Sequence, residues 1–430
     1  MRSAAALTLA LLVAAPVTAP AAPLQWDGPM NWDQVVARAQ SGGFDAQLAA
    51  LDAANAQTQA AQARSLLFPQ IAISGTAMNS TLVQLGMPAA RQTYTSLNAT
   101  MPLFAPQTWA SVKGAQADAF AAQALALAQM DDAALSALQL YDRAALAAAI
   151  VEDRQASLRD EQAHLANTQE RVRAGKSARY VVFRDQAGVA SAQQGLADAQ
   201  AQRDETLNDL ALSLDLALTS HISVALPPPE PLSVNAAVLR ARALLQRPEL
   251  LAAQYALTAQ NDRLRAARAG YLPSVSVEAQ TYSGASNPSL GQTGSQIGVT
   301  ATLPLIDGGM RSAQIRQAEI GFARAQRLYN RARLSVERDV ANAVREYEAA
   351  QAQLTAATAG LQDAQAQLRI AELRERAGKA IELETLDALA TQATARENLS
   401  RAIARCDDAL AAIHHATGDY AVPFSKGVKS

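Results

Sequence analysis

The stretch "RERAGKAIELETLD", residues Arg374 to Asp387, repeats a motif that the chain first contains as "RVRAGKSARYVVFRD" from Arg171. Both copies read R-x-R-A-G-K and both lie between long segments rich in alanine and glutamine. A glycine directly after a long helix supplies the left-handed C′ position, and arginines in the last turn complement the negative end of the helix dipole. Each copy therefore predicts the tip of a helical hairpin.

Other landmarks recur at the same offset. They are Gly175 and Gly378, Pro69 and Pro273, and Pro102 and Pro304, which are 203, 204 and 202 residues apart. A constant offset indicates a tandem duplication. We predict a first repeat over 22–223, a proline-rich seam "VALPPPEPLSV" over 224–234, a second repeat over 235–418 and a C-terminal tail over 419–430.

The N-terminus is typical of a secretory signal peptide. Residues 1–21 contain one arginine, an apolar run and then small residues, so we expect the mature chain to begin near Ala22. No cysteine follows the run, so we expect no lipid attachment. Cys406 is the single cysteine, which excludes an internal disulfide, and its position in a helical series of apolar residues fits a small buried core residue. After the signal we find no apolar run of about 18 residues and expect no transmembrane helix.

Composition limits the class of protein. Of 430 residues 50% are hydrophobic but only 4% are aromatic, and the formal charge is −2. This charge argues against a nucleic-acid partner. The apolar share is largely alanine, which favours long helices that approach one another closely.

Two proline-free stretches, 107–173 and 308–377, predict these long helices, with returning helices over 180–219 and 381–415. In the second, large apolar residues recur every seven positions and alanine follows each by three. The large residues are Val340, Tyr347, Leu354, Leu361 and Leu368, and the alanines are 343, 350, 357, 364 and 371. This is the seam of an antiparallel coiled coil, and at ~1.5 Å per residue each helix would be roughly 100 Å long.

Apolar and polar residues alternate, as they do in strands, in four segments at about 70–80, 93–104, 274–283 and 295–306. Each has about the 9–11 residues that a membrane strand needs, and prolines lie at their ends. Membrane barrels begin at about eight strands, so several copies would have to pool theirs. The alternative is a small sheet that caps a soluble coiled coil.

The segments "ARAGYLPSVSV", "GVTATLPLIDGGMRSAQIRQAE" and "QRPELLAAQYAL", with the paired tips and tandem halves, resemble the TolC-like outer-membrane efflux proteins. The resemblance implies a mainly α fold with membrane β: a trimeric 12-stranded outer-membrane β-barrel, four strands per protomer, continued by a helical periplasmic tunnel. It implies an outer-membrane homotrimer, in contact with its lipid, that works with a periplasmic adaptor protein and an inner-membrane transporter.

The resemblance also implies site residues. Acids six and nine residues after the second tip glycine ring the periplasmic mouth in the family; here they are Glu384 and Asp387, which share a helix face and which we expect to be unpaired. The first hairpin departs from the pattern, with Val181 in place of an acid, so the links that close the mouth are expected to differ. The tips themselves, Gly175 with Lys176 and Gly378 with Lys379, are candidate adaptor-docking sites.

We find no catalytic motif, expect no cofactor, and interpret His164, His221, His414 and His415 as neither catalytic nor metal-binding. The expected function is a passive exit duct for small molecules, gated at the periplasmic tip. The alternatives are a type I protein-secretion channel and a periplasmic structural coiled coil without a pore. The cargo stays open between drugs, metal ions and proteins.

Overall fold

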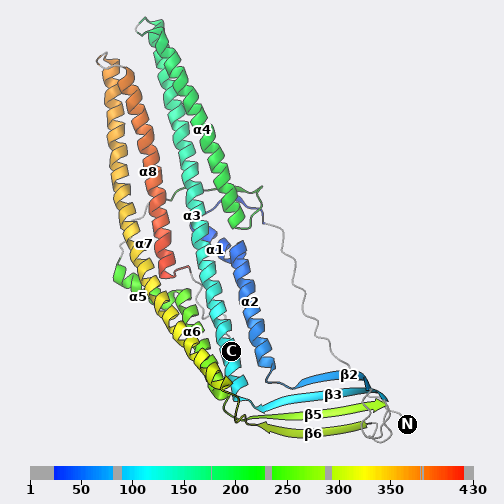
Figure 1. The fold of residues 1–430 in the computed structure, drawn as a ribbon. Coiled ribbons are helices and arrows are strands. Elements are labelled where there is room, and N and C mark those ends of the chain that lie inside the picture. The colour runs from blue at the N-terminus through cyan, green and yellow to red at the C-terminus, as the bar shows by residue number, and fades with distance from the viewer. Residues whose placement is uncertain are drawn as a thin grey trace.

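The computed structural model describes residues 24–80, 90–175, 177–227, 235–285, 293–377, 379 and 382–420. Long helices rise from one end of a small sheet (Figure 1). The helices are α1 (Trp32–Gly42), α2 (Phe44–Ser65), α3 (Pro106–Arg173), α4 (Arg179–Ser213), α5 (Ala236–Gln246), α6 (Pro248–Ala269), α7 (Met310–Arg376) and α8 (Glu382–Thr417). The strands are β1 (Asp27–Pro29), β2 (Gln70–Ser80), β3 (Ala90–Phe104), β4 (His221–Ser223), β5 (Ser274–Ala285) and β6 (Thr293–Thr302).

The helices α3 with α4, and α7 with α8, form two long hairpins that point away from the sheet (Figure 1). Each is preceded by two shorter helices and a pair of strands, so the element order repeats and the tandem organisation is confirmed. The first returning helix is shorter than the expected 180–219. It ends at Ser213, and Asp215 turns the chain with a left-handed φ of 52°.

The four longer strands form one antiparallel sheet in the order β2-β3-β5-β6, in which β3 pairs with β5 and so joins the two repeats. Strand β6 ends at Thr302 rather than at the expected 306, and its pairing with β5 ends at the same residue. Pro304 follows two residues later and has no N–H that could continue the hydrogen bonds between the strands. The short strands β1 and β4 pair in parallel, Asp27 opposite His221, beside the helices.

The sheet has an apolar face and a polar face. Opposed residues of an antiparallel pair share a face, and one face pairs Ile71 with Ala99, Ile73 with Leu97, Ala279 with Ile297 and Val277 with Val299. The other face carries hydrogen-bonded polar pairs, Ser74 with Ser96 at 2.8 Å and Gln280 with Gln296 at 3.0 Å. The apolar side chains are uncovered in the protomer: Ile73 is 75% exposed and Ile297 is 79% exposed.

The two largest apolar clusters of the described residues hold the helical part together, each built mainly from one repeat. The first contains Val35, Leu138, Tyr141, Leu210 and Leu214. The second contains Val340, Tyr347, Ala350, Cys406 and Ile413 from α7 and α8. Every predicted seam position of α7 is buried or half-buried. Small alanines on the seam let the two helices of a hairpin approach closely.

The expectation that no helix could cross a membrane needs correction. By length and composition α3 qualifies, since it contains an 18-residue window of mean hydropathy 1.3, half of which is buried within the protomer. Alanine explains the difference, because it raises mean hydropathy without forming a run of large apolar side chains. A core helix passes the same test, and α3 packs against α2, α4, α6 and α8.

Candidate functional site

The tips of the two hairpins lie at the end of the protein farthest from the sheet (Figure 1). Gly175 adopts a φ of +71°, as a C′ glycine does, and a Cβ added there would meet no atom within 4 Å. At the second tip the exposed Lys379 donates its backbone N–H to the carbonyl of Arg374 at 2.8 Å, which closes the end of α7. Lys176 and Gly378 lie outside the described residues.

The arginines at the tips bind side chains as well as complementing the helix dipoles. Arg171 of α3 forms an ion pair with Glu375 of α7, and Arg374 of α7 forms one with Glu384 of α8 at 3.3 Å. The first pair joins the two hairpins, whereas the second lies within one hairpin. From the sequence, helix capping alone explained these arginines, and neither ion pair was predicted.

The link between Arg171 and Glu375 has a second anchor. Glu375 is 7% exposed, and its Oε2 accepts a hydrogen bond from Thr385 Oγ1 of α8 at 2.6 Å. One carboxylate thus binds a helix of each hairpin. A sequence signal for it existed, because an acidic residue in the last turn of a helix is unfavourable next to the negative end of the dipole.

Glu384 and Asp387 lie in the first turns of α8, where Glu384 is half-buried and Asp387 is exposed. The expectation that both are unpaired is wrong for Glu384, because the hairpin turn brings the last turn of α7 opposite the first turn of α8. The Arg374 and Glu384 side chains are 53% and 41% exposed, so water screens this pair strongly.

Val181, where the family pattern has an acid, is buried. The first hairpin nevertheless has a polar interior near its tip, where His164 Nε2 lies 3.7 Å from Asp185 Oδ2 and both side chains are buried. Burial raises the pKa of Glu161 beside them, and His164 opposes that rise. These charges lie within the first hairpin, so Arg171 rather than an acid at 181 connects it to the second.

Further polar contacts join residues 153–160 of α3 to residues 396–400 of α8. They are Arg396 with Asp160 at 3.1 Å, Ser400 with Asp153 at 3.0 Å and Arg154 with Glu397 at 2.8 Å. Farther down, Ala411 of α8 packs in the apolar cluster of α3, whereas closer to the tips ion pairs and hydrogen bonds connect one hairpin to the other. Such contacts can be exchanged with water at lower cost than an apolar core when two elements move apart.

A second group of acids lies far from the tips, between α3 and α8. Burial, together with the neighbouring carboxylate of Asp408, raises the pKa of Asp142 to about 8 and that of Asp407 to about 7. Trp32 Nε1 donates to Asp142 Oδ1 at 3.1 Å. At neutral pH this raised pKa favours the protonated form of Asp142, whose carboxyl group can share a hydrogen bond with Asp408, so this group is part of the packed interior.

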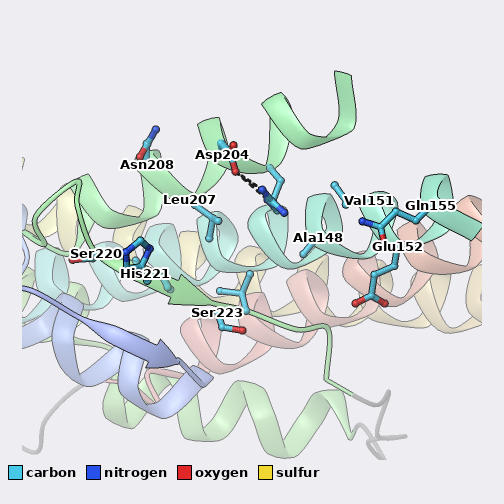
Figure 2. Close-up of a pocket in the computed structure, with 13 residues that line it drawn as sticks. Ala148, Val151, Glu152, Gln155, Asp204, Leu207, Asn208, Ser220, His221 and Ser223 are labelled. Atoms are coloured by element: carbon cyan, nitrogen blue, oxygen red, sulfur yellow. Dashed lines mark hydrogen bonds and ion pairs between the residues drawn. The ribbon is translucent and has the colours of Figure 1, made fainter. Parts of the chain in front are cut away.

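A groove of about 640 Å³ opens beside strand β4, between α3 and α4 (Figure 2). Its lining mixes apolar side chains such as Val151 and Leu207 with the charged Glu152, Arg203 and Asp204. Arg203 and Asp204 form an ion pair at 2.7 Å, so they neutralise each other. The groove lies where the chain continues from α4 into β4, and we assign it no ligand.

Comparison with known families decides the identity of the chain. The family model of outer membrane efflux proteins matches residues 35–215 and, a second time, residues 239–419. The chain belongs to the outer membrane efflux protein family. The resemblance inferred from the tips and the tandem halves is thereby confirmed, and each match covers one repeat of this efflux protein.

Solved structures share its fold. CusC has a TM-score of 0.78 at 21% identity, covering 94% of this chain and 99% of CusC. VceC of Vibrio cholerae has a TM-score of 0.76 at 22% identity, covering 90% and 96%, and the open state of MtrE of Neisseria gonorrhoeae has 0.76 at 22%, covering 90% and 88%. No match was found among the curated proteins.

Proposed function

We propose that this efflux protein is the outer-membrane channel of a tripartite export system and that three copies form it. The observation that supports the proposal best is the sheet, with one uncovered apolar face, one polar face and two edge strands, β2 and β6. A membrane barrel needs apolar residues outside, polar residues inside and paired edges. Four strands cannot close alone, whereas three copies supply twelve.

The long hairpins would continue the barrel as a tunnel through the periplasm. At ~1.5 Å per residue, the 68 residues of α3 span roughly 100 Å, about three times the hydrocarbon thickness of a bilayer. A periplasmic adaptor protein would meet the tips and an inner-membrane transporter would supply the energy. Small molecules are the cargo we favour, and a type I protein-secretion channel is the alternative.

A pore-free periplasmic coiled coil is disfavoured by the same sheet. Ile71, Ile73, Ile297 and Val299 are each at least 67% exposed in the protomer, and such a patch in water would favour aggregation. In a bilayer these side chains face hydrocarbon.

Cell fractionation followed by planar-bilayer recording tests the proposal. We expect the protein in the outer-membrane fraction, as a trimer that dissociates on heating, and stepwise conductance when it is added to a bilayer. Recovery in the soluble periplasmic fraction, or a purified trimer without conductance, would reject the channel.

The tips are proposed to dock the adaptor through exposed backbone at a glycine turn. Gly175→Trp is expected to leave the trimer assembled but to abolish efflux, because a large side chain covers that turn. Gly175→Ala is the matched control, since it places the same backbone strain at φ +71° without the bulk. Drug accumulation in cells and crosslinking to the adaptor measure the effect. If the alanine variant loses efflux equally, the glycine is needed only for its conformation.

A further inference from the structure

Three helices bring an imidazole and two carboxylates together away from the tips. Asp132 of α3, Glu249 in the first turn of α6 and His415 near the end of α8 place one ligand atom each within 4.8 Å of the others. From the sequence, His415 is interpreted as not metal-binding, whereas the structure gives it two carboxylate neighbours. Spacing along one helix could not reveal the group, because its members come from three distant segments.

The closest approach in the group is between His415 Nε2 and Asp132 Oδ1, at 2.8 Å. Two ligand atoms on one tetrahedral zinc ion, each about 2.0–2.2 Å from the metal, lie roughly 3.3–3.5 Å apart. The His415 and Asp132 atoms would separate by roughly 0.5–0.7 Å to reach that spacing, and the Glu249 oxygen lies within 4.8 Å of both. The His415 side chain is 15% exposed and that of Asp132 is 62% exposed, so one side is open to an entering ion.

Arg247 holds two members of the group, Glu249 and His415, in place. Its Nε donates to Glu249 Oε2 at 2.9 Å, its Nη2 donates to Oε1 at 2.5 Å, and its Nη1 donates to the backbone carbonyl of His415 at 3.3 Å. Arg247 is only 7% exposed. Each Glu249 oxygen keeps a second lone pair for a metal. Hydrogen bonds of this kind orient metal ligands from outside the coordination shell.

A buried carboxyl group beside the cluster has no hydrogen-bond partner among the described residues. Asp131 is 0% exposed, and neither carboxylate oxygen has a hydrogen-bond partner in the part of the chain that the structure describes. The charged groups that act on it are His415, Glu249, Arg247 and Asp132. Burial raises the pKa of Asp131 to about 7, so this carboxyl group is partly protonated at neutral pH. Asp132 and Glu249 remain as two carboxylates beside one guanidinium and one imidazole, and a divalent cation is compatible with that charge.

We propose that Asp132, Glu249 and His415 bind a divalent transition-metal ion, with Zn²⁺ as the best fit. An imidazole nitrogen with carboxylate oxygens suits zinc and its neighbours in the first transition row, whereas calcium and magnesium prefer oxygen alone. Water completes the shell on the exposed side. The ion links α3 of the first repeat to α6 and α8 of the second, so its role is to fix the two repeats to each other.

The competing interpretation is an ion pair between protonated His415 and Asp132 that needs no metal. The two interpretations differ in their response to zinc, since an ion pair gains nothing from added metal. Protonation of His415 would also exclude the ion, because the same Nε2 would carry the proton.

Calorimetric titration of the full-length, detergent-solubilised protein with ZnCl₂ tests the proposal. The Glu384→Gln, Asp387→Asn background removes any cation binding at the tips. We expect saturable binding of one ion per chain and a higher melting temperature with zinc. With Co²⁺ as the probe, visible absorption of a four- or five-coordinate ion should appear.

His415→Gln and Asp132→Asn are each expected to weaken zinc affinity at least roughly tenfold, as loss of a ligand does. His414→Gln is the matched control, because its imidazole contacts Asp419 at 3.0 Å instead. It should bind zinc as the background protein does. The proposal is overturned if no saturable binding occurs, or if His415→Gln and His414→Gln bind with equal affinity.

Discussion

The double variant Glu384→Gln, Asp387→Asn is expected to lose most of the cation preference of the channel in a planar bilayer. If three copies surround the mouth, six carboxylates lie within distances comparable to the ~8 Å Debye length at physiological salt. Such a ring attracts cations and excludes anions. Divalent or trivalent ions at micromolar to millimolar concentration, added from the periplasmic side, should block the unmodified channel but not the variant.

Reversal potentials in a salt gradient measure the preference. Glu205→Gln with Asp209→Asn is the control, since it removes two exposed acids of α4 away from the tips. An unchanged cation preference in the Glu384 and Asp387 variant would place the selectivity elsewhere and leave these residues as a solvated helix face.

The ion pair with Arg374 refines this expectation. Glu384 is partly neutralised at 3.3 Å by Arg374, whereas Asp387 is exposed and forms no such contact with Arg374. Asp387→Asn alone should therefore reduce selectivity more than Glu384→Gln alone. Exposed pairs contribute about 0–1 kcal/mol, so the trimer should remain as stable as before.

The features that sequence predicted well are local ones. The tip at Gly175 depends on the conformation of one residue, and the strands depend on alternation over about ten residues, so both could be predicted from neighbours in the chain. The repeat needed only a constant offset. Local signals also misled, because the arginines of R-x-R-A-G-K fit helix capping, and capping gives no indication of the ion pairs with Glu375 and Glu384.

The interactions that sequence missed join segments far apart in the chain. Glu375 meets Arg171 across 204 residues, and His415 meets Asp132 across 283. Side chains at such separations are brought together by the register of one hairpin against the other, which no motif records. The predicted strand ends were also imprecise, because β6 ends at Thr302, where its pairing with β5 stops, and composition does not show where pairing stops.

Arg171→Ala is expected to open the periplasmic mouth. The side chain joins α3 to α7 at the tips through a carboxylate that is 6% exposed, whereas Arg171 itself is 32% exposed. Loss of one partner of a fully buried pair costs about 3–5 kcal/mol, and partial exposure reduces this to roughly 1–3 kcal/mol. If the pair forms only when the hairpins are together, the open population rises roughly 5- to 150-fold, since about 1.4 kcal/mol is tenfold.

Single-channel conductance of the purified trimer measures this opening, and Glu375→Gln should act in the same direction. Arg203→Ala is the control, because it removes an exposed ion pair with Asp204 on α4. The exchange Arg171→Glu with Glu375→Arg should restore low conductance, since it rebuilds the contact with the charges reversed, whereas loss of packing could not be restored in this way. If Arg171→Ala conducts like the unmodified channel, the pair does not hold the mouth closed, and the contacts between α3 and α8 farther from the tips become the candidates for that role.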